Sequence, residues 1–174
     1  AILSRGLGDV YKRQILGFNF IVITILWISS LKTRRADFID IYWGPSFFFS
    51  FLLALVINNS LSVTEIICLF LITIWGFRLG IYLLIRNVNK TEDIRYVKIR
   101  EARGDIGLYL TAYLIQIILI PIVSLPLISI LDTSIDLSFV HWVGILIALS
   151  GILIETIADI QSVSYTHLRA HETG

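Results

Sequence analysis

Long apolar stretches separated by short polar breaks run through most of the chain. A helix needs about 20 mostly apolar residues to cross the hydrocarbon core of a bilayer, and five stretches are close to that length. They are residues 15–31, 38–57, 63–84, 106–131 and 139–161. The pattern therefore predicts an all-α fold, a polytopic helical membrane protein with five spans.

Two local signals refine the third span. Ser62 and Glu65 have the spacing of a capping box, in which each side chain accepts a hydrogen bond from the backbone N–H of the other residue. We therefore expect the third span to begin directly after Ser62. Gly76 and Gly80 form a pair of small residues four apart, which allows close packing against a neighbouring helix.

The basic residues alternate between the connections of these spans. Nine lysine and arginine residues lie in the segments 32–37 and 86–105, and none lies in 58–62 or 132–138. Lysine and arginine accumulate on the cytoplasmic side of membrane proteins. We therefore expect 32–37 and 86–105 to be cytoplasmic and the N-terminus to lie outside.

The composition agrees with a membrane protein and excludes several other classes. Of the 174 residues, 56% are hydrophobic and 16% charged, and the formal net charge is +1. Soluble domains contain about 45–50% apolar and about 25% charged residues, so a water-soluble domain, a disordered chain and a basic nucleic-acid-binding protein are excluded. Because Cys68 is the single cysteine, an intramolecular disulfide and a cysteine metal cluster are excluded as well.

Both ends of the chain have the sequence of a translated DNA adaptor. Residues 4–14 (SRGLGDVYKRQ) and 163–173 (VSYTHLRAHET) can be encoded by opposite strands of one oligonucleotide, which resembles a transposase adaptor. We therefore expect residues 1–14 and 163–174 to be adaptor-derived tails and residues 15–162 to be the N-terminal part of a membrane domain. The HLRAH string then belongs to a tail, and we expect no metal site.

Four charged residues inside the predicted spans are candidates for a functional role, because each costs about 2.5 to 3.5 kcal/mol there on insertion scales. They are Asp40, Arg78, Glu155 and Asp159. Residues three or four apart share a helix face, so Tyr82 continues the face of Arg78. The fourth span adds Tyr109, Tyr113 and Gln116. We expect these polar faces to line a cavity that opens to the cytoplasm, although a salt bridge of Arg78 with Glu155 or Asp159 would explain part of the set.

The polar segment 87–105 is the longest connection, and we expect it to be a loop. Together with Arg86 it contains six basic residues. These residues could bind anionic lipid headgroups or the phosphates of a soluble ligand. A merely solvated cytoplasmic loop has the same composition, so the charge pattern leaves three interpretations open.

Four local strings resemble one family in sequence and order. They are ADFIDIYWGPSF (36–47), IWGFRLGIYLLIRN (74–87), EDIRY (92–96) and GILIETIADIQ (151–161). Together they resemble the bacterial membrane proteins of unknown function that are grouped with the steroid 5-alpha-reductases. The resemblance extends over nearly all of residues 15–161, which is little more than half of a complete member.

The resemblance implies a helical bundle of about seven spans in the bacterial inner membrane, with an NADPH site that faces the cytoplasm. It also implies reduction of a carbon–carbon double bond conjugated to a carbonyl group in a lipid or sterol-like substrate. Hydride would pass from the nicotinamide to the β carbon while protein donors stabilise the enolate. The partners implied are membrane lipid and an apolar small molecule, and no nucleic acid; the oligomeric state stays open.

The resemblance also implies roles for six residues. Asp40 and Tyr82 are the catalytic candidates, since Trp75 occupies the position where steroid reductases have a tyrosine that donates to the carbonyl group. Arg78, Arg95, Glu155 and Asp159 are the candidates for cofactor binding. An indole donates one hydrogen bond but cannot relay a proton as a phenol does, so a lipid or polyprenoid enone is as good a substrate candidate as a steroid.

Two other functions stay open. One is a methyltransferase that resembles the isoprenylcysteine carboxyl methyltransferases and uses S-adenosylmethionine. The other is a small transporter, which we expect to carry polar groups through the whole bilayer, whereas the charges here lie in one half. The family's most specific string, an Arg-His-Pro-Asn-Tyr-type run, would lie beyond Gln161, so we expect the 174-residue chain itself to be inactive.

Overall fold

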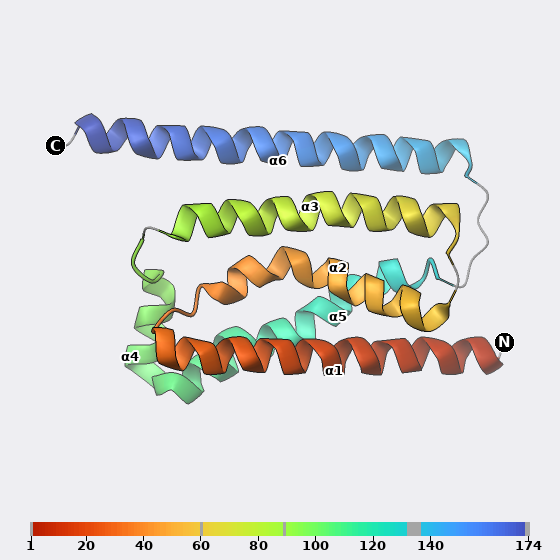
Figure 1. Ribbon diagram of the computed structural model, residues 1–174, viewed down its shortest axis with the longest axis horizontal. Coiled ribbons are helices and arrows are strands. Elements are labelled where there is room, and N and C mark those ends of the chain that lie inside the picture. Colours follow the sequence, from red (N-terminus) through yellow and green to blue (C-terminus); the bar gives the residue numbers. More distant parts are fainter. Residues whose placement is uncertain (1, 60, 89, 132–136, 173–174) are drawn as a thin grey trace. The chain divides into compact units, whose positions relative to one another are not determined.

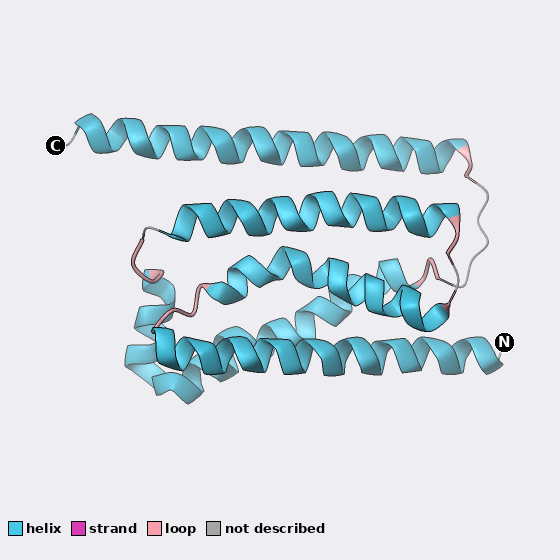
Figure 2. Cartoon of the chain, viewed as in Figure 1, coloured by secondary structure: helices cyan, strands magenta, loops and turns pink. Residues whose placement is uncertain are grey.

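The computed structural model describes residues 2–59, 61–88, 90–131 and 137–172, with side chains from residue 13 onward to residue 162. Every regular element of these residues is a helix, as Figure 1 and Figure 2 show. The elements are α1 (Ile2–Thr33), α2 (Phe38–Asn58), α3 (Val63–Val88), α4 (Ile94–Leu108), the π-helix η1 (Tyr109–Tyr113), α5 (Leu114–Ile128) and α6 (Phe139–Glu172).

The predicted all-α fold with five spans is confirmed. Among the described residues, five helical stretches are long and apolar enough to cross a membrane. They are Arg13–Thr33, Phe38–Asn58, Val63–Val88, Ile94–Ile128 and Phe139–Ser162. The fourth begins well before its predicted start, and the other four begin and end within a few residues of the predicted bounds.

The chain divides into two units, Ala1–Ser134 and Ile135–Gly174. The first contains α1 to α5, and the second contains α6. The predicted adaptor tails contribute the first part of α1 and the last part of α6, where the backbone is helical. The side chains of residues 1–12 and 163–174, including the HLRAH string, lie outside the described residues, and the origin of both tails stays a prediction.

Helix α2 contacts α1, α3 and α5 within the first unit (Figure 1). Its approach to α3 is the closest: a Cβ atom added to Gly44 would lie 2.4 Å from the carbonyl oxygen of Gly76, and one added to Gly76 would lie 2.5 Å from that of Gly44. A Cβ on Gly80 would meet Ile41 and Pro45 at 3.0 Å. The close packing predicted from Gly76 and Gly80 is therefore present, because small residues let two membrane helices touch along their backbones.

The predicted capping box at the start of α3 is also present. The Ser62 N–H donates to Glu65 Oε2 at 2.6 Å, and the Glu65 N–H donates to Ser62 Oγ at 3.3 Å. The two side chains thus satisfy backbone donors that a helix start leaves without partners. Helix α3 begins at Val63, as the sequence predicts.

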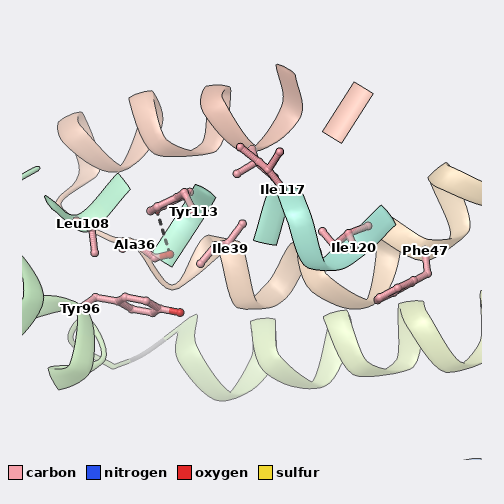
Figure 3. Packing of buried hydrophobic residues seen from close by; sticks show 9 residues of the cluster. Ala36, Ile39, Phe47, Tyr96, Leu108, Tyr113, Ile117 and Ile120 are labelled. Atoms are coloured by element: carbon pink, nitrogen blue, oxygen red, sulfur yellow. Dashed lines mark hydrogen bonds between the residues drawn. The ribbon is translucent and has the colours of Figure 1, made fainter. Parts of the chain in front are cut away.

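Apolar side chains of α2 and α5 form the core next to α1. Ile39 and Phe47 of α2 pack in one cluster with Ile117 and Ile120 of α5 (Figure 3). Ile23 of α1 is fully buried in the same cluster. The packing of these side chains against one another buries apolar faces of α1, α2 and α5.

A buried polar group joins α1 to α2 within the span. Asn19 Nδ2 donates to Ser50 Oγ at 2.9 Å, and the Tyr42 hydroxyl donates to Asn19 Oδ1 at 3.2 Å. Asn19 and Ser50 are fully buried. Because a buried amide is costly unless it is hydrogen-bonded, these bonds hold the two helices in one register.

The expectation of a loop over residues 87–105 is wrong for most of that segment. Helix α4 begins at Ile94, after Asp93 accepts a hydrogen bond from the Arg95 N–H at 2.9 Å. Gly104, at φ +68°, interrupts the helical conformation, so the polar first part of α4 departs from the direction of the membrane-spanning part (Figure 1). Ion pairs between side chains and the Asp93 cap stabilise this polar helix. Neither of them produces a periodic pattern of apolar residues, on which the prediction of helices depended.

The glycine contact between α2 and α3 predicts a specific loss of stability. In Gly44→Ala the added methyl group meets the backbone of Gly76, so we expect a loss of about 1–3 kcal/mol, the usual range for overpacking. Thermal unfolding in detergent, followed by far-UV circular dichroism, measures it. The control is Gly17→Ala on α1, where no atom lies within 4 Å of the added Cβ. Equal stability of the two variants would contradict the contact.

Candidate functional site

Charged side chains gather where α1 ends, α2 begins and α3 leads into α4. We call this region, residues 34–40 and 86–105, the charged end. Figure 1 shows α4 lying across this end of the first unit. Helix α4 therefore places its charged residues next to the connection between α1 and α2.

Asp40 accepts two hydrogen bonds from α4. The Tyr96 hydroxyl donates to Asp40 Oδ1 at 2.6 Å, and Arg95 Nη2 donates to Asp40 Oδ2 at 3.2 Å. Tyr96 is buried, with 6% of its surface exposed, whereas 24% of the Asp40 side chain is exposed. Asp40 and Arg95, both predicted as site residues, are thus brought together, with a phenol as a third member.

Arg95 also pairs with the residue that caps α4. Its Nε and Nη2 atoms donate to the two Asp93 oxygens at 3.0 and 2.8 Å. These hydrogen bonds lower the pKa of Asp93 below its usual value. The Arg95 guanidinium group further lies 5.4 Å from the centre of the Tyr96 ring, where a cation is attracted to the π face.

A buried carboxylate holds the connection between α1 and α2 against α4. Glu92 accepts a hydrogen bond from the Ala36 N–H at 2.7 Å and pairs through both oxygens with Arg100, at 2.9 Å for Nη2. The side chains of Glu92 and Arg100 are only 8% and 14% exposed. Arg100 Nε lies 3.2 Å from Asp105 Oδ1 as well. Glu92 therefore links the Ala36 N–H, in the connection between α1 and α2, to the Arg100 guanidinium group of α4.

A second pair ties the same connection to the end of α3. Arg35 donates to both Asp37 oxygens, at 3.1 and 2.6 Å, and to the backbone oxygen of Asn87 at 2.8 Å. Asp37 is 1% exposed. The hydrogen bond with Asp37 raises the pKa of Arg35, since the carboxylate stabilises the charged guanidinium group. The charged end thus contains ion pairs that involve Asp37, Asp40, Glu92, Asp93 and Asp105.

A polar cavity of about 320 Å³ opens among these residues. Its lining consists of Asp37, Arg86, Asn87, Lys90, Thr91 and Asp93. A second cavity, of about 360 Å³, lies between α2 and α3 and has a largely apolar lining. Its lining consists of Leu52, Leu55, Val56, Asn59, Leu61 and Leu69. The two cavities suit different ligands, a charged group in the first and an apolar one in the second.

Arg78 and Tyr82 lie on a face of α3 that points away from α2. Gly76 and Gly80 touch α2, and Arg78 is roughly 200° around the helix from each of them at about 100° per residue. The Arg86 guanidinium group lies 5.6 Å from the centre of the Tyr82 ring. The predicted shared face of Arg78 and Tyr82 agrees with this arrangement, and the contact with Tyr82 places Arg86 on the same face.

Tyr113 and Tyr109, which belong to the polar face predicted on the fourth span, make hydrogen bonds to neighbouring segments. The Tyr113 hydroxyl, fully buried, donates to the Ala36 carbonyl oxygen at 3.2 Å (Figure 3). The Tyr109 hydroxyl lies 3.2 Å from the Thr24 hydroxyl of α1. Both residues belong to η1, and together they fasten this π-helix to α1 and to the connection that follows it.

Glu155 and Asp159, predicted to bind the cofactor, lie on α6. They are four residues apart and so share a face of that helix. Since α6 is a unit by itself, their roles stay predictions.

Sequence reasoning missed Tyr96, Glu92 and Arg100 as members of the site. Tyr96 and Glu92 belong to the EDIRY string, but the segment was expected to be a loop, in which residues have no common face. Asp93, an acidic residue directly before Ile94, is a typical N-cap and was the signal that could have revealed the helix. With the helix in place, Tyr96 and Arg100 lie four residues apart on one face.

The sequence of residues 26–173 matches a family described as "Protein of unknown function (DUF1295)". The chain belongs to this family. The match includes α2 to α5 in full and all of the charged end, so the site described here lies within the matched part of the chain. No curated protein and no solved structure matches the chain.

The Glu92 contacts predict that this carboxylate stabilises the fold. Glu92→Gln keeps an acceptor for Ala36 but leaves the largely buried Arg100 with Asp105 as its remaining acidic partner, and we expect a loss of about 1–3 kcal/mol, the usual effect of losing a hydrogen bond between charged groups. Denaturant unfolding in detergent measures the change. Glu101→Gln, an exposed position on α4, is the matched control and should leave stability unchanged. A Glu92→Gln variant as stable as this control would refute the role of Glu92.

The lowered pKa of Asp93 predicts a pH dependence. The pair with Arg95 stabilises the folded chain above the ordinary aspartate pKa of about 3.9, and this contribution is lost as the pH falls through the lower folded-state value. Asp93→Asn retains a capping oxygen and should be less stable than the parent at neutral pH. The difference in unfolding temperature should shrink as the pH approaches about 3. A difference independent of pH would show that the cap alone matters.

Proposed function

We propose that this DUF1295 protein is a membrane-embedded reductase that uses NADPH to reduce a double bond conjugated to a carbonyl group in a lipid or sterol-like substrate. The observation that carries the proposal is the hydrogen bond of 2.6 Å from the Tyr96 hydroxyl to Asp40. A phenol oriented by a carboxylate is a donor suited to a carbonyl oxygen. The resemblance to the steroid 5-alpha-reductases supports the same reaction.

In this proposal Tyr96 acts on the substrate oxygen. Addition of hydride to the β carbon moves negative charge to the carbonyl oxygen, and a hydrogen bond from Tyr96 stabilises the enolate that forms. A proton from water then adds to the α carbon of the enolate and completes the reduction. Asp40 accepts the Tyr96 hydrogen when no substrate is bound, and Arg95 holds the other Asp40 oxygen at 3.2 Å. Tyr96 thereby takes the role expected of Tyr82.

The charged end suits a cofactor that carries phosphates. The Arg95 side chain is 63% exposed although it is bonded to Asp40, so a soluble ligand can reach a cation beside the Asp40–Tyr96 pair. NADPH would supply the hydride. Arg78, Glu155 and Asp159 stay the cofactor-binding residues that the resemblance implies. The methyltransferase and the transporter have no comparable observation in their favour.

Turnover by site variants tests the proposal. The reading frame is expressed from its source DNA without adaptor sequence, and membranes are assayed for NADPH oxidation with long-chain enones. Tyr96→Phe removes the donor, and Asp40→Asn removes the carboxylate that orients it. We expect each change to reduce kcat by about 10²–10³, the usual effect of losing one donor to a developing oxyanion.

The control is Tyr109→Phe, which removes a phenol that contacts Thr24 of α1. Its kcat should equal that of the parent protein, and thermal unfolding should show that all three variants are folded. Absence of enone-dependent NADPH oxidation in the parent protein, or full activity of Tyr96→Phe, would refute the proposed function.

A further inference from the structure

The polar cavity at the charged end differs from an ordinary gap between membrane helices. The six described residues of its lining are all charged or hydrogen-bonding, and they come from the connection before α2, the last turn of α3 and the connection that follows α3. Its volume of about 320 Å³ is at the lower end of the range for ligand sites, about 300–1,000 Å³. The cavity therefore suits a compact polar group or one polar part of a larger ligand.

The acids of the lining are already paired. Asp37 is bonded through both oxygens to Arg35, and Asp93 through both oxygens to Arg95. Each of these carboxylates has a guanidinium group within 2.8 Å, so its charge is compensated next to the cavity. The charge that a ligand meets is then determined by the remaining two ionisable residues of the lining.

Those two residues are Arg86 and Lys90. Arg86 donates to the side-chain oxygen of Asn87 at 3.3 Å, and its guanidinium group lies 5.6 Å from the centre of the Tyr82 ring. Its charge also helps to lower the pKa of Asp93, but the direct hydrogen bonds to both Asp93 oxygens come from Arg95. Lys90 is exposed. Thr91 adds a hydroxyl group and Asn87 an amide group, both of which can donate to an anion. The lining thus offers two cations and two neutral donors.

We propose that this cavity binds a phosphoryl group. A phosphate ester carries a charge of about −1.5 to −2 at neutral pH, which matches the two cations. A ligand with a single carboxylate would compensate the charge of only one of them. Arginine binds phosphate oxygens in pairs and lysine binds them as a point charge. The group belongs either to a soluble phosphorylated ligand or to a lipid headgroup. The first source is the cofactor of the proposed reductase, and only that assignment rests on the proposed function.

Binding to the 174-residue chain in phosphatidylcholine nanodiscs tests the inference. In one arm, pyrophosphate is titrated and followed by tryptophan fluorescence; in the other, phosphatidic acid replaces part of the lipid and thermal unfolding is measured. Arg86→Gln with Lys90→Gln should weaken pyrophosphate binding, or the stabilisation by phosphatidic acid, about tenfold or more, as expected for the loss of charge-assisted hydrogen bonds. The arm that responds identifies the source.

The matched control is Lys98→Gln with Arg103→Gln, which removes the same two charges from exposed positions of α4 outside the cavity lining. This control should bind as the parent chain does. Equal weakening in both double variants, or no response to either phosphate source in the parent chain, would overturn the inference. Because Asp40→Asn leaves the cavity lining intact, it should still bind pyrophosphate, so failure of the reductase proposal and failure of this inference give different results.

Discussion

The charged end depends on the contacts that the Glu92 carboxylate makes with Ala36 and Arg100. The connection between α1 and α2 is short, and two of its residues, Ala36 and Asp37, are buried. Buried backbone donors and acceptors need partners, and side chains from other segments supply them. Glu92 accepts from the Ala36 N–H, and the Tyr113 hydroxyl donates to the Ala36 carbonyl oxygen. Arg100 in turn compensates the charge of Glu92 within the same buried site.

The position of Asp40 follows from this arrangement. Helix α2 begins three residues after Arg35, and its first turn carries Asp40 toward α4. Since Glu92 and Arg100 hold α4 against the connection, Tyr96 lies within hydrogen-bond distance of Asp40. One helical turn after Asp40, contact between Gly44 and Gly76 brings α3 close to α2. The cavity with Arg86 and Lys90 therefore forms where α3 ends beside the same connection.

Two features of the charged end complement each other in the proposed chemistry. The Asp40–Tyr96 pair offers a donor for a carbonyl oxygen. The polar cavity, whose lining includes residues close to this pair in sequence, offers cations for a phosphoryl group. Separate ion pairs neutralise Asp37 and Asp93, which leaves Arg86 and Lys90 to determine the charge of the cavity. A membrane enzyme with an apolar substrate and a soluble phosphorylated cofactor requires both kinds of site at one membrane surface.

Apolar length, the capping box and the small-residue pair are local properties, and the sequence alone was enough to predict five spans, the start of α3 at Val63 and the close packing of α3 against a neighbouring helix; that this helix is α2 was decided by the tertiary structure. The sequence also indicated Asp40 and Arg95 as site residues. For residues 94–103 it offers one local helix signal, the Asp93 N-cap, and no apolar pattern, because the ion pairs that stabilise this polar helix involve partners from distant segments. The Tyr96–Asp40 and Glu92–Ala36 contacts join residues 56 positions apart, and only the packing of α4 across the ends of the other helices decides that such residues meet.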